Sequence, residues 1–276
     1  MGNLLKKSLL LLLSASLIVM TGCGEIDDDT VRIKRNNTWV VIMEMGDYPD
    51  GYQDTITDFA SAKRMQKMFM KMGVEDDHMR VVLNEMQSSD VQDSLKWLGE
   101  NADKDDLVFF YATAHGGWLE REVQWETFVS PEWLELDVRD KVLMVDSCDA
   151  GRFIEDFAEV PEAGMAFSVT SADELSWKGL EEEGLPIIGS VWSHYFVETV
   201  FDETSDANGD KLITMEEALS HTDLQVKEYM RNEVFVVEEF LEMYHDLGAY
   251  PLKSEAYPNP LFYNYFEKDL VLYDMN

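Results

Sequence analysis

Two residues that follow apolar segments have side chains capable of covalent chemistry. The segment LVFFYATA at 107–114 leads into His115 and Gly116, and the segment KVLMVDS at 141–147 leads into Cys148. A cysteine thiolate is a strong nucleophile, and an imidazole beside it serves as acid and base. Such a pair would suit acyl transfer, in which the sulfur attacks a carbonyl carbon and the histidine protonates the leaving group.

The elements that carry these residues predict how they meet. Both segments are continuous apolar runs, typical of strands buried on both faces of a parallel sheet. In open α/β sheets, reactive groups collect just past the carboxyl ends of the strands. If the two strands are neighbours, about 4.8 Å apart, His115 and Cys148 project into one crevice. Gly116 and Gly117 would let backbone amides approach a substrate oxygen, and Gly151 would permit a tight exit after the nucleophile.

Each of the two residues also has an ordinary structural interpretation. A single cysteine at a strand end is usually a small buried hydrophobic residue. A histidine there is usually a loop residue with a satisfied hydrogen bond. The joint occurrence of Cys148 and His115 at the ends of two apolar strands, with glycines following each, favours the catalytic interpretation.

The rest of the pattern alternates strands with helices, which predicts an α/β fold with a parallel sheet covered on both sides. Further strands are expected at 38–45, 79–83 and 165–169, and helices at 55–72, 91–99 and 189–201. One domain is expected over residues 37–205. A helical, loop-rich C-terminal portion follows at 206–276, with an aromatic cluster at 261–266 that packs against the domain.

A hydrophobic strand ending in His115-Gly116, followed by one ending in Asp146-Ser147-Cys148, resembles the caspase-like superfamily of cysteine peptidases. The stretches VTSADELSW at 169–177 and GSVWS at 189–193 resemble the legumain family more specifically. The resemblance covers residues 38 to 220. It implies a caspase-like three-layer sandwich with a mainly parallel central sheet.

The resemblance also implies roles for the reactive residues. Cys148 would be the nucleophile and His115 the general acid and base, while the amides of Gly116 and Cys148 would form the oxyanion hole. The chain would then be a cysteine endopeptidase acting on a peptide or protein substrate. Relatives in the family include transamidases, so ligation stays open beside hydrolysis.

The same resemblance places Asp146, Glu174 and Ser176 around the side chain that precedes the cleaved bond. Legumain selects Asn there with a pocket that includes an arginine from the loop after the first strand. The loop at 46–54 of this chain contains no arginine. Without that cation, Asp146 would be free to pair with an Arg or Lys of the substrate, so we expect a basic residue as the alternative to Asn.

The segment DANGDKLITMEE at 206–217 has the spacing of an EF-type calcium loop. The oxygen ligands would come from Asp206, Asn208, Asp210, the carbonyl group of Leu212, and Glu217. Lys211 stands where a glycine is expected, which should weaken or distort the turn. The alternative is a helix cap in which Thr214 and Glu217 form a capping box. A structural calcium ion is therefore predicted, and no organic cofactor is expected.

The first residues predict export. Two lysines precede a 12-residue apolar run at 9–20, which is too short to span a bilayer and typical of a signal peptide. The small residues before Cys23 resemble a bacterial lipobox, which implies cleavage before Cys23 and lipidation of its sulfur. An ordinary secretory signal with a chance cysteine is the alternative. We expect residues 1–22 to be the signal peptide and 23–36 an acidic tether to a membrane.

Composition restricts the remaining classes of function. The chain has 55 acidic and 22 basic residues and a net charge of −33. Because this field repels phosphate backbones, no nucleic-acid partner is expected. A catalytically silent, calcium-dependent binding lipoprotein stays open as another class, although the intact cysteine and histidine argue against it.

Overall fold

The computed structural model describes residues 30–276 apart from 50, 56, 181–182, 238–239 and 241–257. The predicted signal peptide, Cys23 and the first part of the tether therefore lie outside the described residues. Within the part of the chain that is described, no helix is both long enough and apolar enough to cross a membrane.

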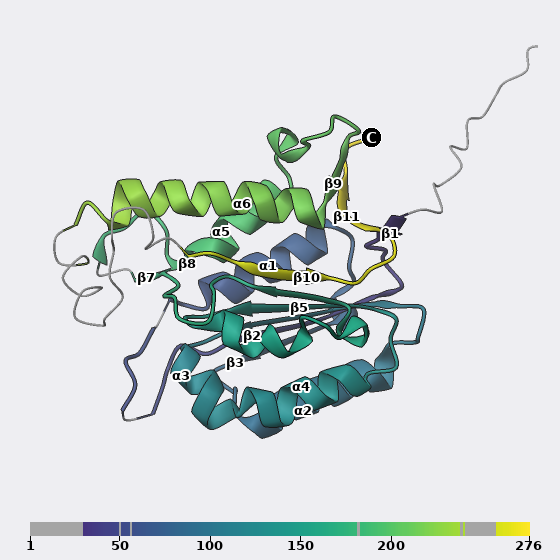
Figure 1. Cartoon of the computed structure of the whole chain (residues 1–276), viewed down its shortest axis with the longest axis horizontal. Coiled ribbons are helices and arrows are strands. Elements are labelled where there is room, and N and C mark those ends of the chain that lie inside the picture. The colour runs from purple at the N-terminus through teal and green to yellow at the C-terminus, as the bar shows by residue number, and fades with distance from the viewer. Residues whose placement is uncertain (1–29, 50, 56, 181–182, 238–239, 241–257) are drawn as a thin grey trace, which may run out of the picture.

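A six-stranded sheet forms the centre of the molecule, in the order β10-β6-β5-β4-β2-β3 (Figure 1). The strands are β2 (Thr38–Glu44), β3 (Met79–Leu83), β4 (Leu107–Thr113), β5 (Asp140–Asp146), β6 (Met165–Ser168) and β10 (Leu261–Asn264). All neighbours run parallel except β10, which is antiparallel to β6. The predicted α/β class is confirmed, and β4 and β5 are direct neighbours.

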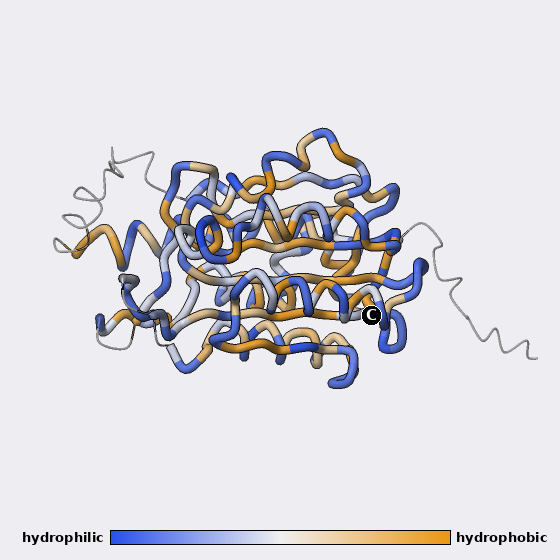
Figure 2. The backbone as a smooth tube through the Cα atoms, turned by 90° about the horizontal axis from the view of Figure 1, so that it is seen from below, coloured by the Kyte–Doolittle hydropathy of each residue, from blue (hydrophilic) through white to orange (hydrophobic). Residues whose placement is uncertain are grey.

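Helices cover both faces of this sheet and complete three layers (Figure 1). One face carries α1 (Ala60–Lys71), α5 (Val191–Thr199) and α6 (Met215–Tyr229), and the other carries α2 (Ser88–Asn101), α3 (Gly116–Trp118) and α4 (Trp125–Glu135). Along β4, Phe109 and Tyr111 belong to the first core, and Phe110 and Ala112 belong to the second. Burial on both faces explains why this strand is continuously apolar. Figure 2 shows hydrophobic stretches of the chain in orange in the interior of the molecule.

Helix α1 begins five residues later than the apolar spacing predicts. Asp58 and Phe59 have left-handed φ angles of 50° and 55°, so the helix starts only at Ala60. The buried Glu44 side chain at the end of β2 accepts a hydrogen bond from the amide of Ala62 at 2.7 Å. A carboxylate at a helix N-terminus is favourable, and here it also fixes Glu44 beneath the carboxyl edge of the sheet.

A small ribbon precedes α5 and shortens the predicted helix at 189–201. It pairs β7 (Lys178–Gly179) with β8 (Gly189–Ser190). The Ser190 side chain caps α5 by accepting from the amide of Ser193 at 3.1 Å. This ribbon brings Lys178 to the carboxyl edge of the sheet.

The C-terminal portion contains strands as well as the expected helix. Strand β11 (Asp269–Asp274) pairs in parallel with β1 (Thr30–Arg32) and antiparallel with β9 (Leu212–Thr214). Part of the predicted tether is thus a strand, and part of the aromatic cluster at 261–266 is the edge strand β10. Their partners are distant in sequence, so local spacing did not indicate the pairing.

Candidate active site

The register of the central strands brings the two reactive residues together. Thr113 and Asp146 are the last residues of β4 and β5 and pair with each other. His115 and Cys148 each follow two residues later. Both line one cavity of about 160 Å³ at the carboxyl edge of the sheet.

His115 is held by contacts on two sides. Its Nε2 lies 2.8 Å from the carbonyl oxygen of Gln53, and its backbone N–H donates to the Tyr48 hydroxyl at 2.9 Å. A carbonyl oxygen only accepts, so Nε2 carries the hydrogen and Nδ1 is the acceptor of the neutral ring. The Tyr48 ring packs against the imidazole at 4.7 Å between centroids. Burial, assisted by the charge of Lys178 and opposed by the Gln53 carbonyl, lowers the pKa of His115.

The thiol of Cys148 is neutral in this resting arrangement. Its Sγ lies 3.7 Å from the carbonyl oxygen of Ser176, to which the thiol donates. Burial raises the pKa of Cys148 to about 11, with a smaller opposing effect from that hydrogen bond. At neutral pH the pair is therefore a thiol and a neutral imidazole rather than an ion pair. In a nucleophilic attack by the sulfur, the proton would have to move to the imidazole.

Gly116 packs directly against the backbone of Cys148. A Cβ atom on Gly116 would lie 2.2 Å from the carbonyl oxygen of Cys148, so no larger residue fits without movement. Gly116 is the first residue of α3, where an amide has no acceptor within the helix. It is not among the described residues that line the cavity, so the structure shows its close approach to Cys148 and leaves its oxyanion role as a proposal.

Oppositely charged side chains lie together beside the dyad. Asp146 is buried, and the Tyr111 hydroxyl donates to its Oδ2 at 2.7 Å. Burial raises the pKa of Asp146. Lys178 Nζ lies 2.8 Å from Oε1 of Glu44, whose side chain is fully buried. Lys178, Asp146 and Glu183 all line the cavity, so a substrate side chain would meet one cation and two carboxyl groups.

Lys178 is a residue that the sequence analysis missed. A cation was sought only in the loop at 46–54, whereas the two-residue strand β7 supplies one from far along the chain. The expectation that Asp146 shares its pocket with no cation was therefore wrong. Gln53 was also missed, because it contributes a backbone carbonyl group that its residue type does not reveal.

The structure separates the two other predicted pocket residues. Ser176 lines the cavity, but Glu174 is not among the described residues that do. The Glu174 carboxylate accepts hydrogen bonds from the amide of Ser171 at 3.0 Å and from the amide of Asn259 at 2.7 Å. Glu174 therefore connects the C-terminal segment to the loop after β6 and does not face the cavity.

The predicted calcium loop folds around Asp206. Its two carboxylate oxygens accept from the amides of Gly209 and Lys211 at 2.7 and 2.9 Å. Lys211 has a φ of 69°, so it adopts the left-handed conformation for which a glycine was expected. The Asn208 and Asp210 side chains accept from the amides of Asp210 and Leu212, both at 2.8 Å.

Glu217, the last predicted ligand, takes part in a helix cap. Its Oε2 accepts from the amide of Thr214 at 3.0 Å, and the Thr214 hydroxyl oxygen accepts from the amide of Glu217 at 3.3 Å. The capping box is therefore present. Among the described residues, the one cluster of three potential metal-binding side chains is Glu75, Asp77 and His78. The carboxylates of the loop are thus not drawn together in this conformation.

Comparison with known proteins identifies the fold. No family model matches the chain, and no curated protein does. The structure is similar to caspase-1 from Spodoptera frugiperda, with a TM-score of 0.57 and 11% sequence identity over 90% of this chain and 94% of that chain. With its three layers and mainly parallel sheet, the chain has the caspase-like fold that the sequence predicted. At this identity the likeness shows the fold alone.

Proposed function

We propose that this chain is a cysteine endopeptidase with Cys148 and His115 as its catalytic dyad. The observation that carries the proposal is the placement of both side chains at equal offsets beyond adjacent strand ends, on one cavity. A nucleophile beside an acid–base group is the arrangement that covalent catalysis requires. The caspase-like fold supports a peptide or protein as the substrate.

The proposed reaction starts from the neutral pair. His115 Nδ1 accepts the thiol proton while the Cys148 sulfur forms a bond to the substrate carbonyl carbon. The amides of Gly116 and Cys148 stabilise the oxyanion. His115 then protonates the leaving amine nitrogen, the carbon–nitrogen bond breaks, and a thioester remains. Water, deprotonated by His115, hydrolyses the thioester to a carboxylate, and the sulfur leaves as the thiol.

The charges beside the dyad favour an amide side chain before the cleaved bond. Asp146 offers a carboxyl oxygen to an amide N–H, and the Lys178 ammonium can donate to the amide oxygen. A basic side chain would meet the like charge of Lys178, and an acidic one would meet the carboxyl groups of Asp146 and Glu183. The legumain-like preference for Asn therefore fits this pocket better than the expected preference for Arg or Lys.

Fluorogenic peptides that differ only in the residue before the cleaved bond test this preference. We expect the Asn peptide to give the highest kcat/KM among Asn, Asp, Arg and Lys. Faster cleavage of the Arg peptide would show that Asp146 governs the pocket despite Lys178.

Labelling with a peptide acyloxymethyl ketone tests the dyad itself. The unaltered chain and the Cys23→Ala variant should both be labelled, whereas Cys148→Ala should not, because Cys148 is the thiol that lines the cavity with His115. Labelling that persists in Cys148→Ala would exclude this thiol as the nucleophile. A folded chain that is neither labelled nor active would support the silent binding lipoprotein. If an added amine is incorporated into the product, the protein is a transpeptidase of the same chemistry.

We also propose that the loop at 206–217 binds calcium through Asp206, Asn208, Asp210, the Leu212 carbonyl and Glu217. The left-handed Lys211 supports this assignment because it keeps the required turn. Binding would require Glu217 to turn from the capping box toward the ion. Calcium should raise the melting temperature of the unaltered chain and of Glu216→Gln, but not of Asp206→Asn. An equal calcium response in all three would leave the helix cap as the sole role of the loop.

We further propose that the chain is an exported lipoprotein anchored to a membrane through Cys23. The support is the signal-like segment at 1–22 that ends before this cysteine. Mass spectrometry of the purified chain should find cleavage before Cys23 and acyl groups on Cys23. The Cys23→Ala variant should no longer be found in the membrane fraction. A Cys23 without lipid after export would indicate an ordinary secretory signal.

A further inference from the structure

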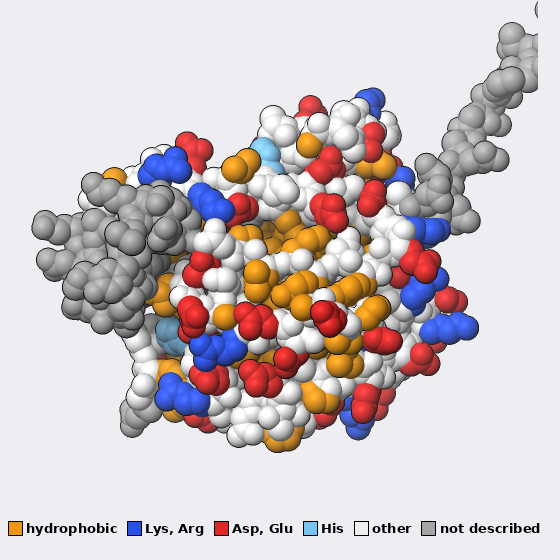
Figure 3. Space-filling view, viewed as in Figure 1, with side chains coloured by type: hydrophobic (Ala, Val, Ile, Leu, Met, Phe, Trp, Pro, Cys, Tyr) orange, Lys and Arg blue, Asp and Glu red, His pale blue; other side chains and the backbone are white. Residues whose placement is uncertain are grey.

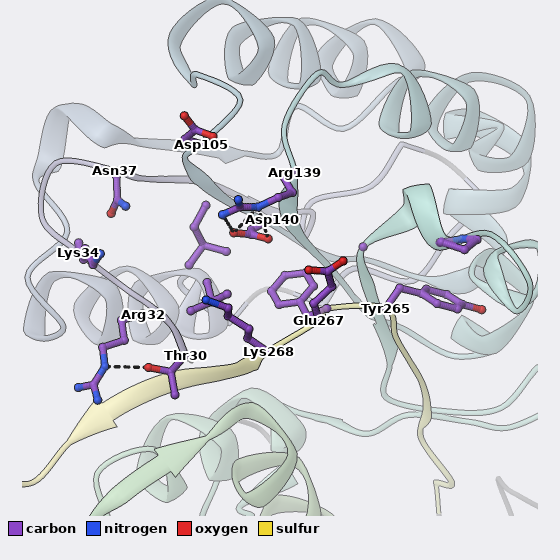
Figure 4. Close-up of a pocket in the computed structure, with 15 residues that line it drawn as sticks. Thr30, Arg32, Lys34, Asn37, Asp105, Arg139, Asp140, Tyr265, Glu267 and Lys268 are labelled. Carbon is purple, nitrogen blue, oxygen red and sulfur yellow. Dashed lines mark hydrogen bonds and ion pairs between the residues drawn. The ribbon is translucent and has the colours of Figure 1, made fainter. Parts of the chain in front are cut away.

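A second cavity lies at the amino edge of the sheet, across the molecule from Cys148. Its volume of about 400 Å³ lies within the range of small-molecule sites. Its walls come from β1, from the residues that precede β4 and β5, and from the connection between β10 and β11 (Figure 4). Segments distant in sequence therefore converge on it.

Basic residues are concentrated in this cavity. The chain as a whole has 55 acidic and 22 basic residues, so acidic side chains outnumber basic ones more than twofold. Around the cavity basic residues outnumber acidic ones by four to three. The charged lining residues are Arg32, Lys34, Arg139 and Lys268, against Asp105, Asp140 and Glu267.

One of the three carboxylates forms an ion pair with a guanidinium that lines the same cavity. Asp140 lies 2.8 Å from Arg139 and, by this contact, contributes most to raising the Arg139 pKa. The charges of Asp105 and Glu267 add to the same effect. Arg139 therefore offsets the charge of Asp140, its ion-pair partner. Figure 3 shows the wider surface, where acidic side chains predominate.

The other three cations stand on the β1 side of the cavity (Figure 4). Among the described residues, the Lys34 ammonium has no hydrogen-bond or ion-pair partner. Arg32 pairs with Asp274, which lies outside the cavity lining, at 2.7 Å. Oδ1 of Asn37, which also lines the cavity, is buried with no hydrogen-bond partner in the described structure. The lining thus offers positive charge to an anion and an acceptor to a nearby donor.

We propose that this cavity binds a small phosphate ester, with its phosphate group against Arg32, Lys34 and Lys268 and a hydroxyl or amine group donating to Asn37. Ammonium and guanidinium groups both bind phosphate, and they attract a doubly charged phosphate more strongly than a singly charged carboxylate. The net charge of the chain opposes this binding only weakly. Exposed charges are screened beyond about 8 Å at physiological ionic strength, whereas the cations contact the ligand.

A soluble phosphate monoester and the monoester headgroup of phosphatidic acid share this chemistry. Thr30 lies seven residues after Cys23, and seven extended residues span at most about 25 Å. If Cys23 is lipidated, a membrane surface is within reach of the cavity. The inference does not depend on the proposed peptidase, because it concerns the opposite edge of the sheet.

Binding of glycerol phosphate to the full chain carrying Cys23→Ala tests the proposal by calorimetry. We expect saturable binding that Lys34→Ala weakens tenfold or more. Arg35→Ala is the matched control, because it removes the same charge from the adjacent residue, whose partner Glu75 lies outside the cavity; it should change the affinity less than twofold. Asp105→Asn should tighten binding, an effect that misfolding would not produce.

Vesicle flotation with the same variants distinguishes the two sources of phosphate. Binding to vesicles that contain phosphatidic acid but not to pure phosphatidylcholine vesicles, lost in Lys34→Ala, identifies a headgroup. Binding of glycerol phosphate alone identifies a soluble ester. The proposal is overturned if neither probe binds, with glycerol phosphate tested up to about 10 mM, or if Lys34→Ala and Arg35→Ala have equal effects.

Discussion

The two edges of the central sheet use charged residues in different ways. At the carboxyl edge, Lys178 pairs with a fully buried Glu44, and burial shifts the pKa values of Cys148 and His115. At the amino edge, ion pairs such as that of Arg35 are largely exposed to water. The same strands supply both edges, so the difference arises from the segments that cover each one. Buried charge costs free energy unless it is paired, so the buried Glu44 at the carboxyl edge depends on Lys178 more than an exposed carboxylate would.

A histidine at each edge provides the largest expected contrast. His115→Ala should lower kcat/KM by about 10²–10⁴-fold, because it removes the acid and base of the reaction. His78→Ala, at the amino edge, should leave kcat/KM within twofold. His78 stacks on Trp39 at 3.8 Å between ring centroids and accordingly contributes to packing. Steady-state kinetics on one Asn peptide measures both.

Melting curves of the two variants separate chemistry from folding. His78→Ala should lower the melting temperature and leave kcat/KM nearly unchanged. His115→Ala should lower kcat/KM strongly and leave the melting temperature nearly unchanged. A large loss of activity in His78→Ala without unfolding would show that the amino edge takes part in catalysis, which contradicts the contrast between the edges.

The second contrast concerns stability at the carboxyl edge. Lys178→Met leaves Glu44 buried without its counter-ion, and breaking such a pair costs about 3–5 kcal/mol. The free energy of unfolding in urea should fall by this amount. The double variant Lys178→Met, Glu44→Gln should recover much of the loss, because no unpaired charge remains. If the double variant is no more stable than the single one, the lysine stabilises through packing rather than charge.

The sequence predicted the centre of the molecule well because local pattern determines it. The apolar run of β4 and the residues that follow it indicated a buried strand with His115 at its end. The run of β5 placed Cys148 in the same way. Parallel neighbours then bring such residues to one edge without further information, so the site and the fold class followed from two segments.

The rest depends on contacts that no local pattern records. Lys178 reaches the cavity on a two-residue strand, and Gln53 acts through its backbone. Glu174 was expected in the pocket from a motif, but its contact with Asn259, distant in sequence, turns it elsewhere. Likewise, β1 and β11 form a sheet from the two ends of the described chain.

The pH dependence of kcat/KM tests the burial of the dyad. Acylation needs a neutral imidazole to accept the thiol proton. Burial lowers the pKa of His115, so activity should fall tenfold per unit only at pH values below the ordinary histidine value of about 6.5. On the alkaline side, a thiol pKa of about 11 keeps the thiol protonated through pH 9. Loss of activity near pH 8 would contradict this protonation state.

Lys178→Met sharpens the same measurement. The charge of Lys178 contributes to lowering the pKa of His115, so its removal should move the acidic limb of the profile to higher pH. Lys141→Met is a suitable control, because Lys141 is a buried lysine that bonds to the carbonyl oxygen of Trp133 at 2.8 Å, away from the cavity. An equal shift in both variants would point to a general effect of net charge.

The smallest effect is expected at the exposed ion pair of the amino edge. Arg35→Ala removes the partner of Glu75, but the Arg35 side chain is 73% exposed. Water and salt screen such pairs, which contribute about 0–1 kcal/mol. The loss in unfolding free energy should therefore stay within this range and disappear in 1 M salt, where the screening length is about 3 Å. A loss that matches Lys178→Met and persists in salt would mean that both edges hold their charges in the same way, because only a desolvated pair behaves like that.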